Sequence, residues 1–470
     1  MHGPALRWTT AALLTGALGC AAAAGIPREA RPPLYSAGVA GAAFGPGAFR
    51  VTLPPDATGT YLPGTSLLAG SDLPAGGPVF PAGQYPVLAP TTPIDLESLA
   101  AGTRDWLGAG TIPGRTAAER DVATRALLDL ALLTDSTGAS VASLFGPWGL
   151  VWPRDASWHA AAFAATGHPE QARAILDFLA RTQTSEGAWA ARYRPDGTPV
   201  TDGRAPQLDA VGWVPWAVWS WWRASPPRVD GDTVSRDTEA LRALWPMLAR
   251  AADAAAAALG PDGLPRASAD YWEQRESQPT IGTAAPLLLG LRSAAAVAAD
   301  LGEAEAARTW TEAAHRLDAA INHTFGDTGY RRYPEADAGP DSAVTFRSAP
   351  LAAPHDDPGA AAVTAAIRRA EAELLMPSGG LRPGNIPRVG AVAWTPATAL
   401  FALAAAGRGD EADFQRWFGW LAAHRTALGA LPEKVADDGF PASVAPLGWT
   451  CSIVLLALVA RDGGVLSPPP

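Results

Sequence analysis

Residues 155–183, DASWHAAAFAATGHPEQARAILDFLARTQ, contain two helical patterns separated by a single glycine. Apolar residues recur at three- and four-residue intervals in 155–167 and again in 169–183, which is the spacing of one face of an α-helix. Gly167 follows the first pattern, and glycine is a common helix terminator. Glu170 stands at the start of the second, where a negative charge is favourable. The stretch predicts a helix hairpin.

The same pattern returns along the chain. DLGEAEAAR around Gly302 and AAGRGDEAD around Gly407 repeat the glycine followed by an acidic, alanine-rich helix start. Asp-Gly-x-Pro occurs at Asp196, Asp262 and Asp438, and predicts tight turns in which glycine supplies a positive φ.

Helical periodicity dominates the chain beyond residue 100. About a dozen helices in hairpins predict a closed toroid, with an inner ring of helices and a funnel of longer loops at one end. An open solenoid is the alternative, but its repeats should be more uniform than these, whose glycine turns are 135 and 105 residues apart. One or two further helices can lie between the eleven periodic segments, which are 117–134, 155–167, 169–183, 208–223, 238–259, 283–300, 303–321, 359–374, 396–407, 410–424 and 449–460.

The first hundred residues have a different character. Residues 1–25 read as a secretory signal, with Arg7 before a short apolar run and small residues after it. ALGC, ending at Cys20, resembles a lipoprotein box, so Cys20 is a possible lipid anchor; a plain signal cut within the alanine run is the alternative. We expect a secreted or cell-surface protein. Residues 26–100 are rich in Pro and Gly and predict a small β or irregular extension, with the helical barrel in 101–470.

Composition excludes several functions. The 470 residues carry a formal net charge of -10, which argues against nucleic acid as a partner. There are only two cysteines, Cys20 and Cys451, so no intrachain disulfide follows processing and a zinc–thiolate site is excluded. Cys451 lies in an apolar run and is expected in the core. The seven histidines have no metal-ligand spacing and no phosphate-binding loop is evident, so we expect no metal and no cofactor.

Two glutamates are the candidates for chemistry. Glu273 follows Tyr271 and Trp272 in DYWEQR, and an aromatic wall disfavours a charged carboxylate. Glu433 follows Leu-Pro in a loop. Either glutamate alone would be an ordinary surface residue. Two carboxylates in aromatic loops, without a histidine or metal partner, fit the hydrolysis of a glycosidic bond.

Tryptophan is abundant, with 18 residues in the chain. An indole face matches the C–H face of a sugar ring. Helical spacing assigns Trp213, Trp216 and Trp219 to packing, whereas Trp148, Trp152 and Trp189 lie in loop-like contexts and are better sugar platforms.

Arg154 and Asp155 follow Trp152 and Pro153 at the start of a helical segment. Asp155 is either the helix N-cap or, with Arg154, a donor–acceptor pair for vicinal sugar hydroxyls.

WGLVWPRDASWHAAAFAATGHPEQARAILDFLARTQ, DYWEQR and ALPEKVADDGFPASVAPLGWT, in this order, resemble the glucoamylase family, glycoside hydrolase family 15. The resemblance covers residues 120–461. It implies an (α/α)6 barrel and the inverting, exo-acting release of glucose from α-glucans. We therefore expect an α-glucan or α-glucoside as the partner, and a monomer.

The resemblance also implies roles for individual residues. Glu273 would be the general acid, Glu433 the general base, and Ser443 a serine that hydrogen-bonds the base. Arg154 and Asp155 match a pair that grips the terminal glucose. The full set of implied substrate-binding residues is Trp152, Arg154, Asp155, Trp189, Arg192, Asp209, Tyr271, Trp272, Arg332, Ser443 and Trp449.

Two positions depart from the family pattern. Trp148 stands near the position where many family members have a tyrosine that helps to hold the catalytic water, and it has no hydroxyl to offer; Gln274 replaces an acidic residue that often follows the general acid. No large β-sandwich or starch-binding module is evident. Alternatives to a glucoamylase-like enzyme are a trehalase or another α-glucosidase with altered linkage specificity, or a non-catalytic sugar-binding surface lipoprotein. The presence of both Glu273 and Glu433 argues against the last.

Overall fold

The computed structural model describes residues 32–44, 48–69, 95–225, 228–230, 233–235, 238–335, 337–352, 358–385 and 392–466. The predicted signal and Cys20 lie outside these ranges, so export and the lipid anchor remain predictions. Cys451 is fully buried in the core, as expected.

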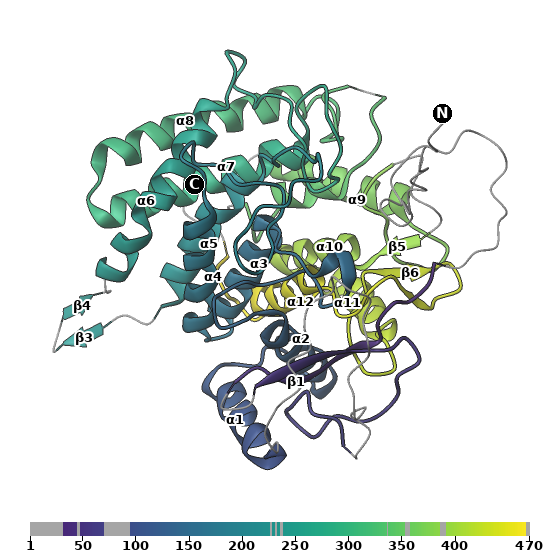
Figure 1. The fold of residues 1–470 in the computed structure, drawn as a ribbon. Helices are drawn as coiled ribbons and strands as arrows, with labels where there is room; N and C mark the ends of the chain where they lie inside the picture. The colour runs from purple at the N-terminus through teal and green to yellow at the C-terminus, as the bar shows by residue number, and fades with distance from the viewer. Residues whose placement is uncertain are drawn as a thin grey trace, which may run out of the picture.

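Six buried segments form the inner ring of the toroid. Each packs against the next, and the last packs against the first, which closes the ring (Figure 1). Almost every residue in them is buried, because each touches neighbours on both sides and the outer helices behind. They are α3 (Pro153–Ala165), α5 (Ala210–Ala224), α7 (Ile281–Leu301), the 3-10 helix η2 (Ser342–Arg347), α10 (Thr395–Arg408) and α12 (Gly448–Arg461).

Six outer helices surround this ring, and each turns one face inward. On most of them Arg, Asp and Glu lie on the outward face, as expected for amphipathic helices, but the first, Ala117–Leu133, is buried over most of its length and includes the buried Glu119, Arg125 and Asp129. They are α2 (Ala117–Leu133), α4 (Pro169–Thr182), α6 (Thr238–Ala257), α8 (Ala304–Thr324), α9 (Pro358–Leu374) and α11 (Glu411–Ala423). The eleven predicted segments match α2 to α12. The all-α toroid is therefore confirmed.

The fourth inner segment differs from the others. η2 has six residues of 3-10 helix, and no periodic pattern in the sequence predicted it. Asp341 caps it through the N–H of Ala343, and Pro350 follows its end, where a proline cannot continue a helix. The inner ring is thus five α-helices and one short turn of helix.

The glycine turns behave as predicted with one exception. Gly167 and Gly302 have φ of 80° and end their helices, but the third helix ends at Gly409 (φ 70°), not at Gly407. Gly407 remains inside α10 because the backbone at Pro350 crosses there. A Cβ on Gly407 would lie 2.3 Å from the nitrogen of Pro350. The turns at Gly197, Gly263 and Gly439 all have positive φ, as expected.

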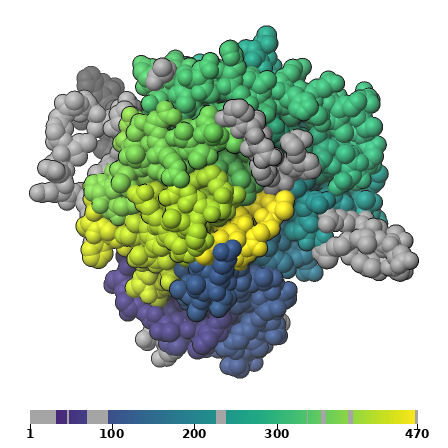
Figure 2. Space-filling model, turned by 180° about the vertical axis from the view of Figure 1, so that it is seen from behind, coloured from purple at the N-terminus to yellow at the C-terminus, as the bar shows by residue number. Residues whose placement is uncertain are grey.

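The N-terminal part forms a small hairpin against the barrel. β1 (Gly38–Ala42) pairs antiparallel with β2 (Phe49–Leu53), with Gly38 opposite Leu53. Their apolar side chains share a cluster with Leu428, from the loop after α11, and with Leu99 of α1 (Leu96–Ala109). Figure 2 shows the purple N-terminal surface adjoining the yellow-green surface of the later chain. The division into extension and barrel at residue 100 remains a prediction, and α1 crosses it.

Two further small sheets complete the described structure. β3 (Arg228–Asp230) and β4 (Thr233–Ser235) form a hairpin between α5 and α6. β5 (Val392–Trp394), β6 (Lys434–Ala436) and β7 (Pro441–Ala442) form a sheet in that order. The second sheet positions the site, because Glu433 directly precedes β6 and Ser443 directly follows β7.

Candidate active site

Most of the predicted site residues lie in loops that lead into the inner helices, whereas Arg154 and Asp155 lie in the first turn of α3 and Trp449 lies in the first turn of α12. Trp152 and Asp209 immediately precede α3 and α5, Glu273 lies between α6 and α7, Arg332 precedes η2, and Ser443 precedes α12. Since outer and inner helices alternate along the chain, the inner helices run in the same direction and their N-terminal ends meet at one end of the toroid (Figure 1). Residues far apart in sequence therefore gather there.

Arg154 and Asp155 form the first polar group. Arg154 Nη1 donates to Asp209 Oδ2 at 3.0 Å and to Gln207 Oε1 at 2.7 Å, and its Nε lies 3.6 Å from Asp155 Oδ2. The guanidinium also lies 5.4 Å from the centre of the Trp449 ring. Arg154, Asp155 and Asp209 are all buried. The structure thus brings four of the predicted residues together: Arg154, Asp155, Asp209 and Trp449.

Asp155 does not cap its helix. Trp152 is the N-cap residue of α3, without a side-chain capping bond, and Pro153 is the first helical residue. The Asp155 carboxyl is instead held in the interior. Burial raises its pKa, the positive charge of Arg154 opposes the rise, the charge of Glu273 adds to it, and the resulting pKa is about 7. The N-cap interpretation is wrong, and the donor–acceptor pair remains.

Glu273 is contacted from two other loops. The indole N–H of Trp152 donates to Oε1, and the guanidinium of Arg204 pairs with Oε2. Glu273 has φ of 57°, and its N–H donates to Asp270 O at 2.8 Å, so a tight turn projects the carboxylate. The tryptophan that donates to the carboxylate therefore precedes it by more than a hundred residues.

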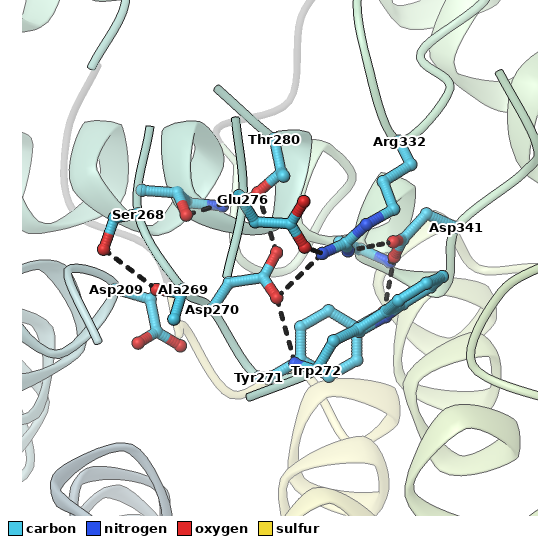
Figure 3. Close-up of polar contacts among 12 residues, drawn as sticks. Asp209, Ser268, Ala269, Asp270, Tyr271, Trp272, Glu276, Thr280, Arg332 and Asp341 are labelled. Carbon is cyan, nitrogen blue, oxygen red and sulfur yellow. Dashed lines mark hydrogen bonds and ion pairs between the residues drawn. The ribbon is translucent and has the colours of Figure 1, made fainter. Parts of the chain in front are cut away.

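Tyr271 and Trp272 turn toward a different group, as Figure 3 shows. The Tyr271 hydroxyl donates to Asp341, and the Trp272 ring lies 3.7 Å from the guanidinium carbon of Arg332. Burial raises the pKa of Asp341, although Arg332 lowers it. The two aromatic residues beside Glu273 thus help to build the Arg332 cluster.

Arg332 is the centre of a buried ionic cluster (Figure 3). Its side chain is 2% exposed, and its terminal nitrogens pair with Asp270 at 3.0 Å, Glu276 at 2.6 Å and Asp341 at 2.7 Å. These carboxylates occupy the donors that a sugar would need. The prediction that Arg332 binds sugar directly finds no support in this arrangement, which instead ties the loop before α7 to the loop before η2.

Glu433 is held at the edge of the β5–β6–β7 sheet. Ser443 donates its hydroxyl to Glu433 Oε2, as the resemblance implied, and Lys434 Nζ lies 3.5 Å from the same oxygen. The backbone is fixed as well, since Glu433 N–H donates to Val444 O at 2.8 Å and Thr395 N–H donates to Glu433 O at 3.0 Å. Glu433 is 8% exposed.

An apolar cluster joins the surroundings of the two glutamates. It contains Trp152, which donates to Glu273, and Val444, which follows Ser443; Trp148 packs against it. Trp449 and Tyr271 are in edge contact, with ring centres 6.0 Å apart. The loops of both glutamates therefore border one aromatic region.

Two weaker predictions have different outcomes. Trp189 is 1% exposed and donates its indole N–H to Leu179 O at 2.9 Å. It fixes the loop after α4 and has no free ring face for a sugar, so that interpretation fails. Arg192 does approach the site. Its guanidinium pairs with Asp202 and lies 5.3 Å from the centre of the Trp152 ring.

Sequence reasoning missed several residues of the site: Asp202, Arg204, Gln207, Asp270 and Asp341. The stretch TDGRAPQLD contained a signal for the first three, since an Asp-Gly turn and an arginine precede Asp209 closely. Among the described residues, no group of three or more His, Cys, Asp or Glu side chains could hold a metal ion.

Comparisons with known proteins identify the family of the chain and relatives of its fold. Residues 117–358 match the model of the glycosyl hydrolases family 15. An uncharacterised glycosyl hydrolase of Methanocaldococcus jannaschii is 30% identical over 99 residues, which span 21% of this chain and only 16% of that protein.

Solved structures support the fold. A wild-type glycosidase superposes with a TM-score of 0.61 at 22% identity, over 76% of this chain and 100% of its own. A bacterial glucoamylase complexed with acarbose gives 0.60 at 18% identity, over 80% of this chain and 61% of its own. A glucoamylase from Saccharomycopsis fibuligera gives 0.57 at 14% identity, over 75% and 97%.

Proposed function

Because this chain belongs to the glycosyl hydrolases of family 15, and so is a glycoside hydrolase, we propose that it is an exported, inverting, exo-acting α-glucosidase. In this proposal it acts on α-glucosidic bonds of oligo- or polysaccharides and releases β-glucose. The predicted signal in residues 1–25 supports export.

One observation carries the proposal: two carboxylates from loops far apart in sequence border the same aromatic region, and each is oriented by its own donor. Trp152 donates to Glu273, and Ser443 donates to Glu433. Most glycoside hydrolases use a pair of carboxyl groups, without a metal, as their catalytic groups. Glu273 would protonate the departing oxygen and Glu433 would take a proton from the attacking water.

The group around Arg154 would bind the terminal glucose. A buried Arg–Asp pair offers charge-assisted hydrogen bonds to vicinal hydroxyls, and the Trp449 ring beside Arg154 offers an apolar face.

The stereochemistry of the product tests the mechanism. An inverting enzyme needs room for water between the base and the sugar, so the two carboxyl groups should be separated by roughly 6.5–9.5 Å in a substrate complex. Maltose, isomaltose, trehalose, dextran and soluble starch should be screened for released glucose, and the best substrate followed by proton NMR. β-Glucose should appear first, and α-glucose only later by mutarotation. With dextran or soluble starch, initial α-glucose would exclude inversion. Trehalose as the sole substrate would favour a trehalase, and its inverting hydrolysis would release one α-glucose and one β-glucose.

A further inference from the structure

Residues 33–36, from the N-terminal extension, run beside the loop that carries Ser443; we call them the N-terminal strut. Leu34 pairs in parallel with Ser443. Ser443 N–H donates to Pro33 O at 2.8 Å, and Tyr35 N–H donates to Ser443 O at 2.6 Å. The strut therefore binds both the N–H and the C=O of Ser443.

Ser36 extends the same contact by two residues. Its hydroxyl donates to Ala445 O at 2.9 Å, and Ala445 N–H donates to Ser36 Oγ at 3.2 Å. Ser36 is fully buried, so these bonds are not shared with solvent. The backbone from Ser443 to Ala445 is thus fixed by four hydrogen bonds to the strut.

The conformation of Ser443 explains why such support is needed. Its φ is 69°, a left-handed value that is unfavourable for a non-glycine residue and persists only where the surroundings enforce it. In this conformation the Ser443 hydroxyl donates to Glu433 Oε2. If the backbone relaxed, the hydroxyl would point elsewhere and Glu433 would lose its donor.

The strut is itself anchored at its far end. Thr426 Oγ1 donates to Ala37 O at 2.6 Å, and Ala37 N–H donates to Leu53 O at 3.2 Å. Ala37 then leads into β1, whose apolar side chains pack with Leu428. The hairpin therefore holds the strut against the loop that precedes Glu433.

We infer that the N-terminal strut positions Glu433 through Ser443, so that the N-terminal extension is part of the catalytic apparatus. Tyr35, through its backbone N–H, and Ser36, through its hydroxyl, are the positioning residues. The inference rests on the proposed function, in which Glu433 removes a proton from water. A general base must lie within hydrogen-bond reach of that water, and a displacement of about 1 Å can cost up to roughly 100-fold in rate.

Matched substitutions separate positioning from stability. Tyr35→Pro removes both the ring and the N–H, whereas Tyr35→Ala removes only the ring. Ser36→Ala removes the bonds to Ala445. Ser293→Ala is its control, since Ser293 is equally buried but bonds to Leu289 O within α7. The measurements are Tm, kcat and KM, with the best α-glucoside of the screen and with α-glucosyl fluoride, whose leaving group departs without protonation.

Tyr35→Pro and Ser36→Ala should lower kcat about 10-fold or more on both substrates, with KM changed less than about twofold. Ser293→Ala should keep nearly the wild-type kcat, and Tyr35→Ala, which retains the backbone N–H, should lower kcat less than Tyr35→Pro. The defect must persist on the fluoride, because its hydrolysis still needs the base. Recovery on the fluoride, or a kcat for Ser36→Ala equal to that of Ser293→Ala, would overturn the inference. If Tyr35→Pro does not fold, Ser36→Ala decides alone. A wild-type enzyme that releases no glucose would remove the proposed function, and with it the role of the strut.

Discussion

Trp152, the N-cap of α3, donates its indole N–H to Oε1 of Glu273 in the loop before α7. The contact joins the start of the inner helix α3 to the loop that leads into α7, and one other inner helix, α5, lies between them along the chain. It also leaves a single edge of the carboxylate, at Oε2, for Arg204 or for a substrate. The geometry of the candidate acid is therefore set by residues outside its own loop.

Replacing Trp152 by Phe should impair proton donation by Glu273. Phenylalanine keeps an aromatic ring but cannot donate, and a hydrogen bond to a charged group contributes roughly 1.5–3 kcal/mol, which is about 10- to 100-fold in rate. We expect kcat to fall by that factor on an oligosaccharide and much less on α-glucosyl fluoride. Trp245→Phe on the outer helix α6 is the control. An equal loss on both substrates would show that Trp152 acts on sugar binding or on the fold.

Asp155→Asn should stabilise the protein at alkaline pH while it weakens activity. Burial raises the pKa of Asp155 from 3.8 to about 7. Between these values the folded protein holds a proton that the unfolded chain has released, so the free energy of unfolding falls as pH rises and the loss is complete above about pH 7. At its largest, this loss in the free energy of unfolding is about 4 kcal/mol. Urea unfolding at pH 5 and pH 8 should show a gain for Asp155→Asn at pH 8 that shrinks at pH 5.

Asp177→Asn serves as the control for that experiment, because Asp177 lies on the outer face of α4, 43% exposed, and pairs with Arg173. It should change stability little at either pH. A pH-independent effect of Asp155→Asn would mean that Asp155 is ionised in the folded protein throughout this range. A wild-type kcat/KM in Asp155→Asn would contradict its role in binding glucose.

The toroid could be predicted from the sequence because the patterns that specify its helices are local. Helical periodicity and glycine terminators lie within each segment, and they located the eleven helices α2 to α12. η2 was missed because six residues are too few to show a period, and its start and end depend on Asp341 and Pro350. The end of α10 was misplaced at Gly407 because the packing of Pro350, from another loop, keeps that glycine helical.

The site was predicted less completely, because its contacts connect distant loops. Family motifs located Glu273, Glu433, Arg154 and Asp155, whose chemistry is carried by residue type. They did not show that Trp272 belongs to the Arg332 cluster or that Arg204 reaches Glu273. Adjacency in sequence suggested aromatic walls for Glu273 at 271 and 272, but a tight turn directs the carboxylate toward Trp152 instead.

Arg332→Ala should lower the free energy of unfolding, and its effect on KM should be small by comparison. It leaves Asp270, Glu276 and Asp341 buried without their cation, and breaking a buried pair costs roughly 3–5 kcal/mol. Denaturation with urea should show this loss near neutral pH, and a smaller loss in acid, where Asp341, whose pKa burial raises, can take up a proton. Arg316→Ala, on the exposed face of α8, is the control. A stable Arg332→Ala protein with a raised KM would show direct binding of sugar.

Arg204→Gln should raise kcat for substrates that need a proton from Glu273. Trp152 orients the carboxylate through Oε1, and in the unliganded site Arg204 pairs with Oε2, which is the oxygen left to carry a proton to the leaving group. Arg204 is 37% exposed and also lies 3.5 Å from Asp202, which limits the strength of the pair. A partly exposed ion pair contributes at most about 1 kcal/mol, so kcat should rise about two- to fivefold.

Hydrolysis of α-glucosyl fluoride by Arg204→Gln should stay unchanged, because this substrate does not need a proton from the acid. Arg194→Gln, on the neighbouring exposed turn, should alter neither rate. A fall in kcat/KM on both substrates would instead assign Arg204 to the binding of the substrate.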